Sequence, residues 1–377
     1  MKNFLQVKYY TSGKDILNLL RGKNDMKIYL LSVHNIGNNF GTTLQACALY
    51  DYVSEINSDT TIINYRPKYS YNKGKIGQLV KKVLYFKDAM LQEKRYREYY
   101  DSHSKLTKKV ERYSDLGKFN DGDLYIIGSD QVWNPSYDCG NDPAYYLKFV
   151  NGNKIAYSAS VGQVLDDKQL TNLCSLINDF SYIGVRESCT YEQLSKLQFN
   201  NIKHVVDPVF LHSVQYYRNV KFQPPFPNYI LVYAVTYDEE IERTIQEARK
   251  LLGKKVVLLG GYRLKYSCDL YYRSAGPSEF ANLIMNCDLF IANSFHGCAF
   301  SILFERQFVV FKSKVATERI ESLLKKLDLE ERMISNSSEL KEQIENPIQY
   351  KTVTKKLKGW IEESKEFLNS AIRSFEK

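Results

Sequence analysis

A buried strand that leads directly into a helix is encoded by Asp288-Leu-Phe-Ile-Ala-Asn-Ser-Phe-His-Gly-Cys-Ala-Phe-Ser-Ile-Leu-Phe304. The apolar run predicts the strand, and the Asn-Ser pair after it can cap the helix. Unpaired amides and the positive end of the helix dipole meet at such a helix start, where α/β proteins bind anions. His296, one of only five histidines, falls at this point. The pattern suggests an anionic substrate and proton transfer by His296, although a capped helix beside a partly buried histidine explains it equally well. The binding residues expected here are Asn293, Ser294 and Gly297.

A polar loop with two glycines follows the first predicted strand, in the segment 35–45. Glycines allow a ligand to approach the backbone closely, and Asn, Thr and Gln side chains offer neutral hydrogen bonds to hydroxyl or phosphate oxygens. The Gly-x-x-x-Gly spacing lacks the third glycine of the dinucleotide-binding fingerprint. A substrate loop and an ordinary polar turn both remain open. The substrate-binding residues expected here are Asn38, Gly41, Thr42 and Gln45.

A carboxylate and a guanidinium follow two further predicted strands. Asp130 can accept a proton from a sugar hydroxyl, or can cap the next turn. Arg186 can clamp a phosphate or carboxylate with two hydrogen bonds, or can pair with Glu187. Beside Asp130 we expect Ser129 to bind substrate and Trp133 to stack against a sugar ring.

The composition is that of a globular protein, with 44% hydrophobic and 25% charged residues. The seven cysteines are scattered and include no Cys-x-x-Cys pair, which favours reduced thiols in a cytoplasmic protein. No signal peptide and no apolar run long enough to span a membrane is seen, so we expect a cytoplasmic location. The histidines lie far apart without a ligand-like spacing, and no metal site is expected.

The net charge of +9 is concentrated in residues 73–118, which contain 13 Lys or Arg and 6 Asp or Glu. The stretch predicts helices with basic faces, over 76–86 and 88–103. A solvated surface, peripheral contact with the inner membrane surface, and recruitment of a phosphorylated acceptor are all compatible with it. Nucleic acid is not expected as a partner, since no nucleic-acid-binding motif is visible.

Alternating strand and helix patterns predict two Rossmann-like α/β domains that face each other across a cleft. Three prolines between Lys221 and Asn228 mark the junction between them. The expected parts are an N-terminal extension (1–25), an N-terminal α/β domain (26–220) with the basic helical insertion (73–118), a C-terminal α/β domain (228–345) and a C-terminal helix (350–377).

Five short motifs together resemble the polysaccharide pyruvyl transferase family, over about Met26 to Leu329. Each motif is weak alone, whereas their order and spacing are fairly specific. They are Asn38-Asn-Phe-Gly-Thr-Thr-Leu-Gln45, Gly128-Ser-Asp-Gln-Val-Trp133, Val185-Arg-Glu187, Val206-Asp-Pro208 and Asn293-Ser-Phe-His-Gly297.

The resemblance implies a GT-B-like fold and transfer of a pyruvyl group from phosphoenolpyruvate to two hydroxyls of a sugar, which forms a ketal in a cell-surface glycan. The donor is a substrate, and no cofactor is implied. The acceptor is a polysaccharide or its lipid-linked precursor, and the reaction takes place in the cytoplasm. Arg186 matches the family's donor-binding arginine, and His296 matches its essential histidine.

The chain departs from the family at one position, because Ser294 stands where ketal-forming members carry the arginine of Arg-Leu-His. The negative charges of the donor then need other cations. The alternatives to pyruvyl transfer are a glycosyltransferase that takes a nucleotide sugar, near Gly261 and Glu279, and a non-catalytic glycan-binding protein. The candidate replacement cations are Arg263, Lys312, Lys314 and Arg319.

Overall fold

The structure is a computed structural model, and it describes residues 26–34, 39–69, 85–197, 199–260, 266–312 and 317–376. Some expectations lie outside these residues. They are the N-terminal extension 1–25, the first helix of the basic stretch up to residue 84, and the roles of Asn38, Gly261, Arg263 and Lys314.

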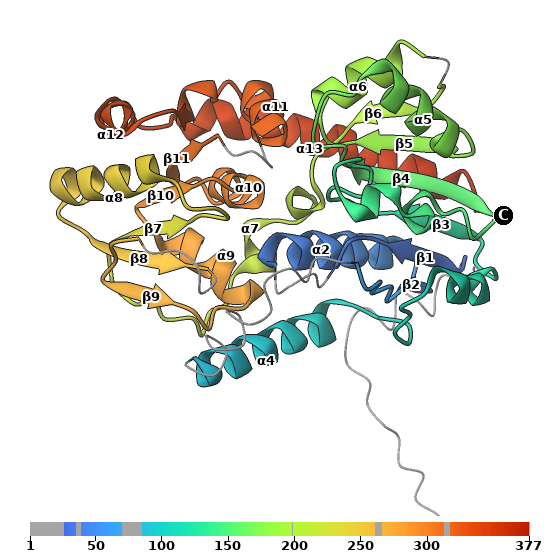
Figure 1. Cartoon of the computed structure of the whole chain (residues 1–377), viewed down its shortest axis with the longest axis horizontal. Coiled ribbons are helices and arrows are strands. Elements are labelled where there is room, and N and C mark those ends of the chain that lie inside the picture. Colours follow the sequence, from blue (N-terminus) through green and yellow to red (C-terminus); the bar gives the residue numbers. More distant parts are fainter. Residues whose placement is uncertain are drawn as a thin grey trace, which may run out of the picture.

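The first half of the chain forms a sheet of six parallel strands in the order β2-β1-β3-β4-β5-β6 (Figure 1). The central strands β1 and β3 are buried along their whole length, because parallel sheets are covered on both faces. This explains why their sequences are continuous apolar runs. The strands are β1 (Ile28–Leu31), β2 (Thr60–Ile62), β3 (Leu124–Ile127), β4 (Asn153–Ala159), β5 (Tyr182–Val185) and β6 (Ile202–His204).

Helices flank this first sheet, and two short elements lead out of it. The 3-10 helix η4 (Pro208–Leu211) follows β6, and α7 (Val214–Tyr217) continues toward the second half of the chain. The flanking helices are α2 (Phe40–Ile56), α4 (Phe86–His103), α5 (Asp167–Ile177) and α6 (Ser188–Ser195).

A second sheet of six parallel strands has the order β12-β11-β10-β7-β8-β9. Two α/β domains, each built on a parallel sheet, confirm the expected fold class. The strands of the second sheet are β7 (Tyr229–Tyr233), β8 (Lys255–Leu259), β9 (Leu270–Tyr272), β10 (Leu289–Ala292), β11 (Gln307–Phe311) and β12 (Met333–Ile334). Its helices are α8 (Glu239–Leu252), α9 (Pro277–Asn286), α10 (Phe295–Leu303), α11 (Thr317–Leu327) and α12 (Leu340–Glu345).

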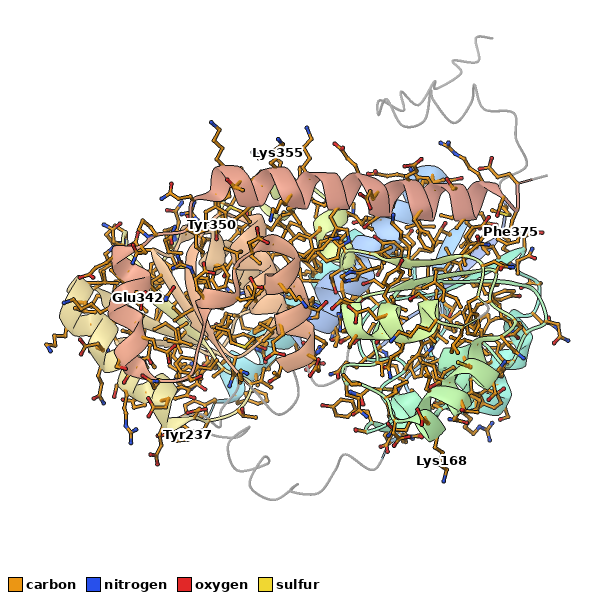
Figure 2. All side chains as sticks on the ribbon, turned by 90° about the horizontal axis from the view of Figure 1, so that it is seen from above. Lys168, Tyr237, Glu342, Tyr350, Lys355 and Phe375 are labelled. Atoms are coloured by element: carbon orange, nitrogen blue, oxygen red, sulfur yellow. The ribbon has the colours of Figure 1, made fainter. Side chains whose placement is uncertain are left out.

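The last helix, α13 (Tyr350–Arg373), runs from the second domain back along the first (Figure 2). The Trp360 indole donates a hydrogen bond to the carbonyl oxygen of His204 at 3.1 Å. The Ser364 hydroxyl accepts one from the amide of Val206 at 3.0 Å. α13 therefore ties the end of the first sheet to the second domain.

The described part of the basic stretch includes α4, which runs beneath both domains along the lower edge of the molecule in Figure 1. Arg95 of α4 forms an ion pair with Glu279 of α9 at 3.0 Å, and it donates to the carbonyl oxygen of Ser274 at 2.8 Å. Nearby, Phe40 at the start of α2 stacks on Phe280 of α9 with ring centroids 4.7 Å apart. Polar and aromatic contacts thus hold the two domains together beside the cleft. Within the described ranges, no helix is long and apolar enough to cross a membrane.

Candidate active site

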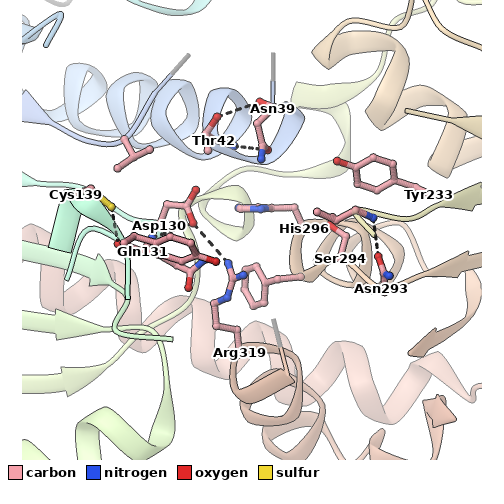
Figure 3. A pocket seen from close by; sticks show the side chains of 14 residues that line it. Asn39, Thr42, Asp130, Gln131, Cys139, Tyr233, Asn293, Ser294, His296 and Arg319 are labelled. Atoms are coloured by element: carbon pink, nitrogen blue, oxygen red, sulfur yellow. Dashed lines mark hydrogen bonds and ion pairs between the residues drawn. The ribbon is translucent and has the colours of Figure 1, made fainter. Parts of the chain in front are cut away.

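A cavity of about 260 Å³ lies between the two domains, where the carboxyl ends of β1, β3, β7 and β10 approach one another (Figure 3). The carboxyl ends of strands are the usual binding edge of α/β sheets. Its lining residues are Val33, Asn39, Thr42, Asp130, Gln131, Tyr137, Cys139, Tyr233, Val235, Asn293, Ser294, Phe295, His296 and Arg319.

The second domain contributes the start of α10 to this cavity. β10 ends at Ala292, and the Ser294 side chain caps the helix by accepting the amide hydrogen of Gly297 at 3.4 Å. The amides of Phe295 and His296 belong to the first turn, which the helix cannot satisfy internally. The strand and the helix start expected from the sequence are therefore confirmed, and their amide groups lie at the cavity.

The first domain contributes the start of α2, directly opposite. Asn39 caps this helix, and its side-chain oxygen accepts the amides of Gly41 at 2.9 Å and Thr42 at 3.3 Å. Asn39 and Thr42 line the cavity, whereas Gln45 is fully buried and bonds to the Val33 carbonyl oxygen at 3.0 Å. Two helix N-termini therefore face one cavity, and both favour negative charge there.

Gly41 contacts the imidazole of His296 across the domain boundary. A Cβ atom at position 41 would lie 2.0 Å from Nδ1 and 2.5 Å from Cγ of His296. Any side chain would therefore displace the ring. The sequence suggested that Gly41 lets a ligand approach the backbone. In the structure, the group that packs against Gly41 is the His296 ring.

The Nε2 edge of the His296 ring faces Asp207. Nε2 is buried and lies 3.6 Å from Oδ2 of Asp207, at the end of β6. The same oxygen accepts hydrogen bonds from Arg186 at 2.8 Å and from Ser129 at 3.1 Å. Burial acts to raise the pKa of Asp207, but His296 and Arg186 outweigh it and hold that pKa well below its usual value. Asp207 is therefore an anion at neutral pH.

Arg186 lies behind the cavity wall, where acids and an aromatic ring surround it. It pairs with Asp207 at 2.8 Å, with Glu187 at 3.3 Å and with Asp130 at 3.6 Å. Its guanidinium stacks on the Phe295 ring, 4.4 Å from the centroid. Burial acts to lower its pKa, but the three carboxylates raise it. Arg186 and Ser129 do not line the cavity, so a direct contact of either with the donor remains a prediction.

Asp130 lines the cavity in a strained backbone conformation, with φ of 74°. One of its carboxylate oxygens is 3.6 Å from Arg186 and also 3.6 Å from Arg319. Both distances exceed hydrogen-bonding length, so the carboxylate can still engage a substrate hydroxyl.

Arg319, from the first turn of α11, is the arginine that lines the cavity, and it points toward Asp130 (Figure 3). Burial, together with the charge of Arg186, lowers its pKa to about 10, so it stays protonated at neutral pH. By contrast, Lys312 is 61% exposed and pairs with Glu321 on the surface. Of the four candidate replacement cations, Arg319 alone among the described residues reaches the cavity.

Three expected binding residues have internal contacts instead. Trp133 is 1% exposed and donates to the carbonyl oxygen of Tyr145, so the expectation that it stacks on a sugar is not met in this arrangement. Gly297 packs against the Phe290 ring, which a Cβ atom would meet at 2.8 Å. Asn293 lines the cavity but uses its side chain to hold the loop after β7, accepting the Val235 amide at 2.7 Å.

Other cavity residues were not expected from the sequence. Tyr137, Tyr233 and Phe295 add aromatic surface, and Cys139 also lines the cavity. Burial and the charge of Asp130 raise the pKa of the Cys139 thiol to about 12, which excludes a thiolate nucleophile at neutral pH. Asp207 was visible only as the centre of the Val-Asp-Pro motif. Among the described residues, no group of three or more His, Cys, Asp or Glu side chains could hold a metal ion.

The fold and the interdomain cavity define a GT-B-like protein with two Rossmann-like domains. A family model described as polysaccharide pyruvyl transferase matches residues 35–314, and the chain belongs to this family. No significant match was found among curated proteins.

Solved structures with a similar fold include sugar-nucleotide enzymes. UDP-GlcNAc 2-epimerase from Neisseria meningitidis, bound to UDP-GlcNAc, is 10% identical, with 92% of this chain and 99% of that chain covered and a TM-score of 0.56. MnaA from S. aureus, in a co-structure with UDP, is 9% identical, with 88% and 90% covered and a TM-score of 0.51. At these identities the likeness concerns the fold alone.

Proposed function

We propose that the protein transfers a pyruvyl group from phosphoenolpyruvate to two hydroxyls of a sugar in a cell-surface polysaccharide or its lipid-linked precursor, forming a ketal. One observation carries this proposal. In a chain of the pyruvyl transferase family, a single cavity is lined by Arg319, His296 and the first turns of α2 and α10. Together they offer positive potential and a proton donor to an anionic enol ester.

Arg319 takes the place of the arginine that the family carries at position 294. Its charge enters the cavity from α11, opposite Asp130, and so reaches the same space from a different element. Phosphate or carboxylate oxygens of the donor compete with Asp130 for this guanidinium. The loose distance of 3.6 Å between Arg319 and Asp130 favours the exchange.

The chemistry is addition followed by elimination. His296 protonates the methylene carbon of the donor, and a sugar hydroxyl attacks the adjacent carbon while its proton passes to Asp130. Phosphate then leaves, and the second hydroxyl attacks the same carbon and closes the ketal, with its proton passing to phosphate or solvent.

In this scheme the donor binds to the protein without a cofactor, and the acceptor sugar packs against aromatic side chains that line the cavity, Tyr137 from the first domain and Tyr233 from the second. We place the reaction in the cytoplasm. The basic residues of the stretch 73–118 support peripheral contact with the inner membrane surface, where lipid-linked acceptors are held.

A nucleotide sugar is the second candidate donor, because the structural relatives named above were solved with UDP or UDP-GlcNAc. That alternative expected the nucleotide to bind near Gly261 and Glu279. In the structure, Glu279 is engaged with Arg95 at 3.0 Å and with the Gly276 amide at 2.9 Å. The Glu279 carboxylate is therefore used within the protein and does not line the cavity.

Phosphorus NMR of the reaction tests the proposal. The protein is incubated with phosphoenolpyruvate and a lipid-linked glycan extract, and the donor signal is expected to convert to inorganic phosphate while a ketal methyl signal grows in the proton spectrum. His296→Ala is expected to slow this conversion by about 10²–10⁴-fold. Conversion of a nucleotide sugar instead, with phosphoenolpyruvate unchanged, would move the protein to the glycosyltransferases.

A further inference from the structure

We propose that Asp207 is a positioning residue that holds the proton of neutral His296 on Nε2, so that Nδ1 is the nitrogen that exchanges a proton with the substrate. The inference rests on the proposed function for the identity of that substrate. It concerns a residue to which neither the fold nor the cavity lining assigns a role.

The first step is the asymmetry of the imidazole. His296 lines the cavity and is 7% exposed, yet its Nε2 atom is fully buried. Nε2 has no hydrogen-bond partner among the described residues, and it lies 3.6 Å from Oδ2 of Asp207. Catalytic hydrogen bonds are often long in ligand-free proteins and tighten in the complex. Because Nε2 faces a carboxylate and not the cavity, Nδ1 is left for the substrate.

The second step is the rigidity of the carboxylate. Its Oδ1 accepts the amide of Val209 at 3.1 Å, and its Oδ2 accepts Arg186 and Ser129. These three groups and His296 meet one buried carboxylate, which also caps the start of η4. Asp207 cannot turn away, and it offers His296 only lone pairs, which require a proton on Nε2.

The third step is the face of the ring. Gly41 packs over this face, since a Cβ atom there would lie 2.0 Å from Nδ1, 2.5 Å from Cγ and 2.7 Å from Cε1, and so the ring cannot move toward α2. The imidazole is therefore held between Asp207 and Gly41 of the first domain, although His296 itself belongs to the second. An acidic side chain that fixes a histidine in one tautomer is the logic of hydrolase triads.

The test is a long-range nitrogen–proton NMR spectrum of protein with labelled histidine, recorded in alkaline solution, with His296→Gln to assign the signal. Native protein is expected to carry the His296 proton on Nε2, and a native spectrum with the proton on Nδ1 overturns the proposal without any variant. Asp207→Asn should raise the share of the Nδ1-protonated form and lower turnover by about 10²–10⁴-fold.

Glu187→Gln is the matched control, because Glu187 is equally buried and pairs with Arg186, but it bonds to Ser160 and Val161 and not to His296. It should leave the tautomer unchanged. An Asp207→Asn protein with the native tautomer ratio and native turnover contradicts the proposal. Since the spectrum needs no donor, native protein that shows the expected tautomer but does not convert phosphoenolpyruvate would refute the proposed function and leave the positioning role standing.

Discussion

Replacing Gly41 with alanine is expected to impair the chemistry far more than the fold. The new methyl group would lie 2.0 Å from Nδ1 of His296. Since non-bonded atoms settle at about 3.5 Å, the ring must move by about 1.5 Å. Misplacing a catalytic group by about 1 Å can cost about 100-fold in rate, and we expect a loss of at least that size in turnover.

Stability should change much less. Alanine is favoured over glycine in helices by up to about 1 kcal/mol, which offsets part of the roughly 1–3 kcal/mol that overpacking costs. The free energy of unfolding should therefore fall by no more than about 2 kcal/mol. Phosphate release from phosphoenolpyruvate and urea denaturation, measured on the same preparation, separate the two effects.

Two further proteins control this experiment. Gly359→Ala lies on α13, where an added Cβ atom meets nothing within 4 Å, and it should keep native turnover. His296→Ala removes the ring that the methyl group meets. In that background, adding Gly41→Ala should therefore cause no further loss of stability. A Gly41→Ala protein with native turnover and native stability would refute the interlock between Gly41 and His296.

Other predictions follow from the charged groups of the site. Arg319→Gln should weaken phosphoenolpyruvate binding by about 10- to 100-fold, the value of a charge-assisted hydrogen bond, while Lys312→Gln should leave it unchanged in calorimetry. Arg186→Gln should instead lower the unfolding free energy by about 3–5 kcal/mol, measured by urea denaturation, because it leaves buried carboxylates uncompensated. Burial lowers the pKa of His204 to about 4 from 6.5. The unfolded chain then binds a proton that the folded protein excludes, so stability is complete above about pH 6.5 and falls by up to about 3 kcal/mol toward pH 4. Denaturation curves across this range should show the loss, and His204→Gln should make it smaller, leaving the share of His34 and His212, whose pKa values burial also lowers.

The features that could be predicted are those set by neighbouring residues in the chain. The apolar run before Asn293 and the cap at Ser294 suffice to place β10 and the start of α10, because burial period and capping chemistry act over a few residues. The two-domain architecture follows in the same way from the alternation of such units.

The features that could not be predicted depend on how the two domains dock. Both Arg186 and Arg319 were expected to bind the anionic donor. In the structure, three carboxylates enclose Arg186, whereas Arg319 lines the cavity. Likewise, the local sequence cannot show whether a glycine makes room for a ligand or, as at Gly41, for a histidine of the other domain. Trp133 follows Asp130 closely, but the turn between them directs the indole into the core of the first domain.

Calorimetric titration of the native protein with phosphoenolpyruvate, and in parallel with UDP-sugars, tests the central claim most directly. The account predicts that phosphoenolpyruvate binds at one site per chain and that UDP-sugars do not compete for it. Binding of a UDP-sugar, with no heat from phosphoenolpyruvate even when a glycan extract is present, would contradict it.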